Sequence, residues 1–138
     1  MIEEIKGFVE IQSGNSYETL EKLEKFFDGI APALEALKEQ RLLIKYLIAS
    51  GVNHMFKIDT SLARGLDYYT GMIFEAVLQG KDAEIGIGSI AGGGRYDNLI
   101  GMFSQNKIPS VGGSIGVERI FTILEDRASK SSEVLNPI

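Results

Sequence analysis

The sequence predicts an α+β protein in which helices precede a mainly antiparallel sheet. Before about residue 53, apolar residues recur at helical spacing, whereas the rest of the chain holds short segments rich in Ile, Val and Phe. The links between those segments are mostly too short for crossover helices, which favours antiparallel pairing. We therefore expect an antiparallel sheet with helices to one side.

Residues 1–52 are expected to form a helical segment. Two helices fit the apolar spacing of "SYETLEKLEKFFDGIAPALEALKEQRLLIKYLIAS", because "DGIAP" interrupts the pattern between them. They are expected over about 16–28 and about 31–50. Ser16 is the predicted N-cap of the first helix, and Gly51 is expected to close the second.

The strands are expected within residues 53–128. Strand composition is found in "HMFKIDT" (residues 54–60) and in "TGMIFEAVLQ" (residues 70–79), and "GKDAE" follows as a predicted hairpin loop. A glycine-rich strand is then expected in "IGIGSIAGGGRYDNLIGMF", where a short helix starts near Arg95 or Tyr96.

The last predicted strand lies in "IPSVGGSIGVERIFTILEDRA" and leads into an amphipathic helix. The apolar residues expected to face inward from this helix are Ile120, Phe121, Ile123 and Leu124. The polar tail "SKSSEVLNPI", residues 129–138, is expected to fray.

Composition excludes several classes of site and partner. The chain has no cysteine and a single histidine, which rules out a disulfide framework and a zinc centre. A net charge of −5, from 14 basic and 19 acidic residues, argues against a chain-wide nucleic-acid surface, so any such contact would be local or made elsewhere. Neither a long apolar run nor a signal-like N-terminus is present, and we therefore expect a cytoplasmic protein without a membrane anchor.

The first polar cluster lies in "RGLDYYTG", where Arg64, Asp67, Tyr68 and Tyr69 crowd the start of a predicted strand. A guanidinium binds carboxylates or phosphates through two parallel hydrogen bonds, and tyrosines supply flat walls with a hydroxyl at the edge. On a strand the two tyrosines would point to opposite faces, so at most one would enter a given site. The plain alternative is a surface Arg–Asp ion pair beside two half-buried tyrosines.

Two glycine-rich clusters follow. The first, "AGGGRYD" (residues 91–97), permits close approach of a ligand to the backbone, or equally a β-bulge and turn, and its spacing matches neither a dinucleotide fingerprint nor a Walker loop. The second, "GGSIGVER" (residues 112–119), places Arg119 on the first turn of a helix, within reach of a terminal phosphate or merely in solvent. An antiparallel sheet would bring all three clusters onto one face, which favours a site for a phosphorylated or nucleotide ligand.

Three motifs stand in order along the chain: "RGLDYYTG", "AGGGRYDNLIG" and "VGGSIGVERI". Together they resemble the catalytic domain of the histidyl-tRNA synthetases, which are class II aminoacyl-tRNA synthetases. The resemblance is greatest to the eukaryotic cytosolic form and covers about residues 40–127, and the preceding helices resemble the later part of the family's helical insertion. It implies that the parent enzyme activates histidine with ATP and Mg²⁺ to histidyl-adenylate and charges tRNA(His) as a cytoplasmic homodimer.

The resemblance also assigns roles by motif. Arg64 would be the catalytic arginine, placed beside the α-phosphate and the histidine carboxylate. Besides Arg64, the histidine pocket would be formed by Tyr68, Tyr69, Tyr96 and, as its floor, Gly112. ATP would contact Arg64, Gly116 and Arg119, the last of these at the γ-phosphate. No metal ligand is assigned.

Several features of the family are absent from this chain. The first class II motif, which builds much of the dimer interface, is missing, as are the second motif, which grips the α-phosphate, and the anticodon-binding domain. We therefore expect a fragment that does not aminoacylate tRNA by itself. A glycine in "AGGGRYD" also replaces the family's usual alanine.

Non-catalytic alternatives stay open. Synthetase-like paralogues act as a regulatory subunit of the first enzyme of histidine biosynthesis or as the uncharged-tRNA sensor of a stress kinase, and a partial domain with half a site is the structural alternative. An intact "RGLDYY" and Arg119 favour the enzyme, because a paralogue without catalysis has less need of a phosphate-contacting pair.

Overall fold

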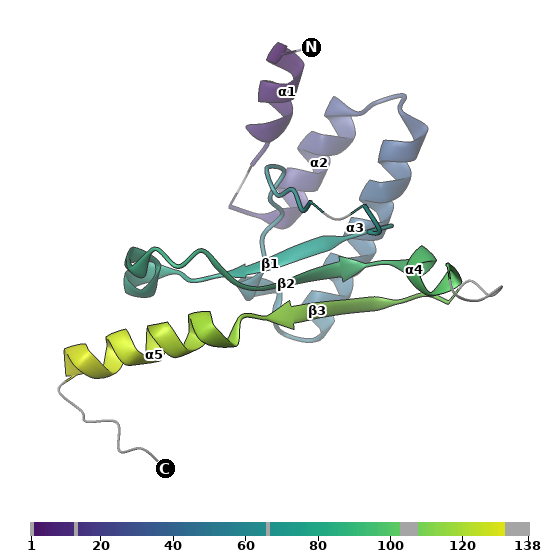
Figure 1. The fold of residues 1–138 in the computed structure, drawn as a ribbon. Coiled ribbons are helices and arrows are strands. Elements are labelled where there is room, and N and C mark those ends of the chain that lie inside the picture. Colours follow the sequence, from purple (N-terminus) through teal and green to yellow (C-terminus); the bar gives the residue numbers. More distant parts are fainter. Residues whose placement is uncertain (1, 13, 66, 103–107, 132–138) are drawn as a thin grey trace. The chain divides into compact units, whose positions relative to one another are not determined.

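The computed structural model describes residues 2–12, 14–65, 67–102 and 108–131. It divides the chain into two compact units, Met1–Arg64 and Gly65–Ile138. The first unit is helical, and the second carries a three-stranded antiparallel sheet, as the element labels in Figure 1 show. The predicted α+β class with an antiparallel sheet is therefore confirmed.

The helical unit contains α1 (Ile2–Val9), α2 (Ser16–Phe26), α3 (Ala31–Ala49) and the short 3₁₀ helix η1 (Asn53–Met55). Helices α2 and α3 pack together because their apolar residues recur on one side of each helix. Their buried core consists of Leu20, Leu23, Leu37 and Ile44. At its edge Arg41 donates two hydrogen bonds to Glu24, from Nε to Oε1 at 2.6 Å and from Nη2 to Oε2 at 2.7 Å.

The predicted helix ends agree with the structure to within two residues, but the predicted N-cap is wrong. Helix α2 begins at Ser16, and its N-cap is Asn15, whose extended backbone lets the side-chain oxygen accept the Tyr17 N–H at 2.9 Å. Asn and Ser cap helices about equally well, so a run containing both does not decide between them. Gly51 follows α3 with φ of 72°, a conformation that glycine adopts without strain.

The predicted strand over residues 54–60 is also wrong. Its start is occupied by η1, Asn53–Met55, whose local hydrogen bonds replace a strand ladder. Further on, Ile58 packs against the helical core and the Thr60 hydroxyl donates to the Val9 carbonyl at 3.1 Å. Ile58 therefore packs in the helical unit and not on the sheet, while Met55 and Phe56 are exposed.

The sheet consists of β1 (Ile73–Val77), β2 (Ser89–Arg95) and β3 (Val111–Ile115) in the order β1-β2-β3, with both pairs antiparallel (Figure 1). The three strands lie within the segments predicted for them. The predicted hairpin loop between β1 and β2 is the 3₁₀ helix η2 (Gly80–Ile85), and a register shift between Ala76 and Val77 marks a bulge next to it.

Two helices complete the second unit, α4 (Asp97–Gly101) after β2 and α5 (Val117–Ser131) after β3. In α5, Ile123 is buried, but Phe121 and Leu124 expose 56% and 49% of their surface, so the prediction that both face inward is wrong. Only one stripe of α5 meets the narrow sheet, and positions 121 and 124 lie outside it. Arg127 of α5 also pairs with Asp82 of η2.

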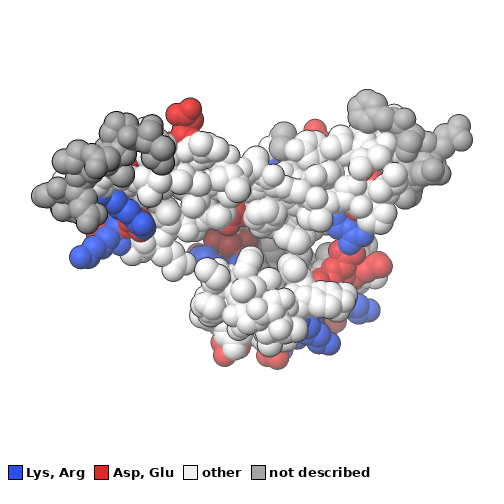
Figure 2. Space-filling model, turned by 90° about the horizontal axis from the view of Figure 1, so that it is seen from below, with Lys and Arg blue, Asp and Glu red and all other residues white. Residues whose placement is uncertain are grey.

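Two further observations concern the hydropathy and the charge of the described residues. Within those ranges, no helix is long and apolar enough to cross a membrane. On the face drawn in Figure 2, the coloured side chains of the described residues occur as small groups of both signs, without a broad basic area.

Candidate functional site

One face of the sheet has a floor of glycines near the end of β2. Gly94 pairs with Ile73 of β1 on one side and with Gly112 of β3 on the other. Directly paired residues in an antiparallel sheet project to the same face, so these three positions form one row. Because two of the three have no side chain, other side chains can lie directly against the backbone there.

Tyrosine rings cover this floor. A Cβ built on Gly94 would lie 2.8 Å from two ring carbons of Tyr69, and a Cβ built on Gly112 would lie 3.1 Å from Cζ of Tyr96 and still closer to its hydroxyl. Real Cβ atoms essentially never come within 3.0 Å of such neighbours. The absence of side chains at Gly94 and Gly112 is therefore what lets Tyr69 and Tyr96 lie against the sheet.

Tyr68, Tyr69 and Tyr96 form what we call the tyrosine cluster. Their ring centroids are 4.8 Å apart for Tyr68 and Tyr69, 5.8 Å for Tyr68 and Tyr96, and 6.5 Å for Tyr69 and Tyr96. The rings are tilted or edge-on to one another, at 50°, 86° and 57° respectively, and all three are half-buried. Aromatic pairs favour such tilted and edge-on arrangements over face-to-face stacking.

The prediction that Tyr68 and Tyr69 point to opposite faces is wrong. Both lie before β1, Tyr68 in a turn and Tyr69 directly after it, where the alternation of a strand does not apply. The turn lets two successive rings join Tyr96 in one cluster.

The opposite face of the sheet is closed by Phe74. This residue pairs with Gly93, which pairs in turn with Gly113, and a Cβ on Gly113 would lie 2.8 Å from the Phe74 ring. A Cβ on Gly93 would lie 2.5 Å from Cα of Gly113, so the strands leave no room there for any side chain. The run "AGGGR" is thus the interior of a closely paired strand, and the bulge lies elsewhere.

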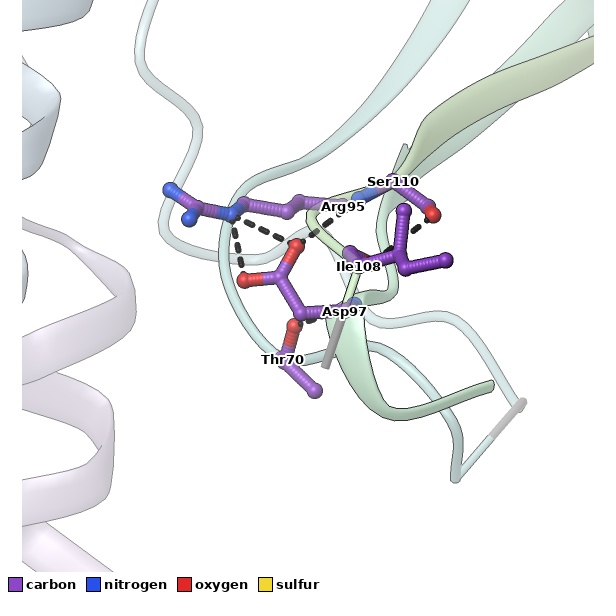
Figure 3. A network of polar contacts seen from close by, with 5 residues as sticks. All are labelled: Thr70, Arg95, Asp97, Ile108 and Ser110. Atoms are coloured by element: carbon purple, nitrogen blue, oxygen red, sulfur yellow. Dashed lines mark hydrogen bonds and ion pairs between the residues drawn. The ribbon is translucent and has the colours of Figure 1, made fainter. Parts of the chain in front are cut away.

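A network of polar contacts joins the strand ends beside the tyrosine cluster (Figure 3). Arg95 Nε donates to both Asp97 carboxylate oxygens, at 3.0 and 2.8 Å, and the Ser110 N–H donates to Oδ1 at 3.0 Å. The Asp97 N–H donates to the Thr70 hydroxyl at 3.0 Å. The Arg95 guanidinium and the Ser110 N–H hold the pKa of the Asp97 carboxyl below its usual range.

Sequence analysis did not single out Asp97, Thr70 or Ser110. The available signal was the Arg-x-Asp spacing of residues 95–97, which can place two opposite charges on one side of an extended chain. Thr70 and Ser110 gave no such signal, because their role depends on strand pairing between residues distant in the sequence.

Arg119 lies at the other end of the sheet. Its guanidinium donates to the Ser89 carbonyl at the start of β2, and its aliphatic stem packs beside Gly116. Ser89 precedes Gly94 by five residues on β2, which corresponds to about 17 Å at 3.4 Å per residue. Arg119 and Gly116 are therefore well separated from the tyrosine cluster along the sheet.

Arg64 is the last residue of the helical unit and is half-buried. Its expected place beside the tyrosine cluster stays a prediction. Among the residues that the structure describes, no group of three or more His, Cys, Asp or Glu could hold a metal ion.

Comparison with known proteins gives concordant results. A family model described as histidyl-tRNA synthetase matches residues 3–120. The chain is 55% identical over 106 residues to the cytoplasmic histidine–tRNA ligase of Dictyostelium discoideum, covering 77% of this chain and 21% of that protein. It is 51% identical over 108 residues to the mitochondrial histidine–tRNA ligase of Homo sapiens, covering 73% of this chain and 21% of that protein.

Among solved structures, histidyl-tRNA synthetase from Nostoc sp. PCC 7120 matches 96% of this chain with a TM-score of 0.75 and 34% sequence identity. The match covers 30% of that chain. The present chain thus spans less than a third of the length of each of these three proteins.

Proposed function

Because this chain belongs to the histidyl-tRNA synthetase family, we propose that it forms the histidine-binding part of a histidine–tRNA ligase. In this proposal the enzyme activates histidine with ATP to histidyl-adenylate and then charges tRNA(His). The tyrosine cluster above Gly94 and Gly112 carries the proposal, since it brings flat walls and hydroxyl groups together over a floor of glycines.

The tyrosine cluster suits an imidazole ring for two reasons. A neutral imidazole has one N–H donor and one nitrogen acceptor, and a phenolic hydroxyl can both donate and accept. The tilted rings also present apolar faces to a small planar group. Tyr68, Tyr69, Tyr96 and the floor glycine Gly112 are accordingly assigned to histidine.

The phosphates are assigned to three residues, Arg64, Gly116 and Arg119. A carboxylate oxygen of histidine attacks the α-phosphorus while the bond to the bridging oxygen breaks and pyrophosphate leaves. Negative charge builds on the α-phosphate oxygens, and a fixed guanidinium from Arg64 stabilises it. Arg119 holds the γ-phosphate, and Mg²⁺ accompanies ATP to neutralise phosphate charge, with no protein ligand assigned to it.

We further propose a cytoplasmic homodimer for the full-length enzyme. The relatives include cytoplasmic and mitochondrial ligases, and the expectation of a cytoplasmic protein rests on the sequence. The relatives named above are all described as synthetases or ligases, so they give no support to a regulatory or sensor paralogue.

Calorimetric titration of the 138-residue chain with histidine tests the assignment. We expect saturable binding of histidine and none of phenylalanine, which has no hydrogen-bonding ring atoms. Tyr69→Ala should weaken histidine binding, whereas Tyr46→Ala, which removes an exposed tyrosine of α3, should leave it unchanged. Equal affinity for histidine and phenylalanine, or equal loss in both variants, would contradict the proposal.

A further inference from the structure

We propose that Asp97 is a positioning residue that fixes the tyrosine cluster in the arrangement on which histidine binding depends. The identity of the ligand rests on the proposed function, whereas the geometry rests on the hydrogen bonds that meet at Asp97 (Figure 3). Asp97 follows Tyr96 directly, and its carboxylate is engaged by Arg95 and Ser110. Its effect on a ligand would therefore be transmitted through the tyrosines.

The first set of contacts fixes Tyr96 over its floor. Ser110 donates its N–H to the Asp97 carboxylate at 3.0 Å and accepts the Tyr96 N–H on its carbonyl at 2.8 Å. The backbone N–H and the carbonyl of Ser110 are thus both hydrogen-bonded, to the adjacent residues Asp97 and Tyr96 respectively. Two residues later comes Gly112, whose missing side chain makes room for the Tyr96 hydroxyl. Asp97 therefore sets the register between Tyr96 and the strand beneath it.

The second set of contacts fixes Tyr69. The Asp97 N–H donates to the Thr70 hydroxyl at 3.0 Å, and the Thr70 N–H donates to the Arg95 carbonyl at 2.9 Å. Arg95 in turn donates from Nε to the Asp97 carboxylate at 2.8 Å. Tyr69 is the residue before Thr70, so this ring of contacts holds the turn that carries it.

A carboxylate is the group best suited to this position. It accepts from the Arg95 guanidinium on both oxygens and from the Ser110 N–H at the same time. An asparagine could still accept from Ser110, but its NH₂ group would face the Arg95 N–H, donor against donor. Asp97→Asn therefore separates the hydrogen bond from Ser110 from the ion pair with Arg95, while Asp97→Ala removes both.

The test compares Asp97→Asn and Asp97→Ala with Asp82→Asn, in the 138-residue chain. Asp82 is a matched control, because its carboxylate also pairs with an arginine in the same unit and its pKa is also lowered by that pairing. Two quantities are measured: nuclear Overhauser cross-peaks between the rings of the tyrosine cluster, and the dissociation constants for histidine and for ATP. Thr70→Val serves as a further variant that leaves the carboxylate in place.

We expect the Asp97 variants to stay folded, to lose ring cross-peaks and to bind histidine about 10- to 100-fold more weakly, the size of effect that misplacement by up to 1 Å produces. ATP affinity and the Asp82→Asn variant should be unchanged. Thr70→Val should shift the Tyr69 ring resonances. Unaltered cross-peaks and histidine affinity in Asp97→Asn and Asp97→Ala would overturn the proposal, as would equal losses for histidine and ATP.

The outcomes also separate this inference from the proposed function. If the parental chain binds no histidine while the ring cross-peaks still depend on Asp97, the proposed ligand is wrong and the positioning role stands. If the Asp97→Ala variant does not fold, the Asp97→Asn variant provides the test, because it retains the contact to Ser110.

Discussion

Replacing Gly112 by alanine should disturb the tyrosine cluster without unfolding the sheet. The added Cβ would lie inside 3.0 Å of the Tyr96 hydroxyl and 3.1 Å from its Cζ, whereas ordinary contact begins at 3.4 Å. The hydroxyl must therefore retreat by about 1 Å, and the three atoms nearest to the new Cβ all belong to the Tyr96 side chain. A ring can swing at modest cost, so we expect a loss of stability of about 1–3 kcal/mol at most.

Binding should suffer more than stability. Displacements of 1 Å within a site cost up to about 100-fold, so a shift of this size should weaken histidine binding by about 10- to 100-fold. Calorimetry measures this affinity, and urea unfolding measures the stability of the same variant. Ser114→Ala is the control, because Ser114 also lies on β3 and projects to the same face, opposite Gly92.

Either of two results would contradict this prediction. If Gly112→Ala binds histidine as well as the parental chain, the gap between Tyr96 and the floor does not determine binding. If Ser114→Ala is equally impaired, the effect comes from the strand as a whole. In either case Gly112 loses its assignment as the floor of the pocket.

Three further predictions follow from packing and charge. Gly93→Ala should cost about 3 kcal/mol and melt the sheet, since its Cβ meets Cα of Gly113 at 2.5 Å, and circular dichroism in urea would show whether it does. Leu20→Ala should cost about 2–5 kcal/mol in the helical unit, because Leu20 is fully buried, and the urea midpoint reports it. The folded-state pKa of Asp97 is lowered by Arg95, so its stabilisation is complete above the unfolded value of about 3.9 and is lost as the pH falls through the folded-state pKa. Asp97→Asn should flatten that acid dependence below about pH 4 in a pH titration of stability, and an unchanged profile would exclude this contribution.

The sequence predicted best those elements whose cause is local. Helices α2 and α3 follow from apolar spacing and from the "DGIAP" break, and the glycine-rich strands follow from runs that helices disfavour. The segment over residues 54–60 misled the prediction because its apolar residues resemble those of a strand. Whether it packs on helices or joins a sheet depends on partners far away in the chain.

The sequence indicated which residues lie together more successfully than it indicated how they are arranged. Tyr68, Tyr69, Tyr96 and Gly112 were grouped by motif, and the structure brings these four together. The strand pattern did not predict that Tyr68 and Tyr69 both lie in one cluster, because two adjacent tyrosines before a strand are ordinarily assigned to that strand. Asp97 was missed as well, since its importance arises only when the ends of β2 and β3 meet.

The most direct test of the account is a histidine titration of the 138-residue chain with isotope-labelled tyrosine, followed by NMR. The chain has five tyrosines, of which Tyr17 and Tyr46 lie in the helical unit and report on non-specific effects. We predict saturable shifts of the ring resonances of Tyr68, Tyr69 and Tyr96, with Tyr17 and Tyr46 unmoved. Shifts confined to Tyr17 and Tyr46, or no saturable shift in the tyrosine cluster, would contradict the claim that the cluster binds histidine.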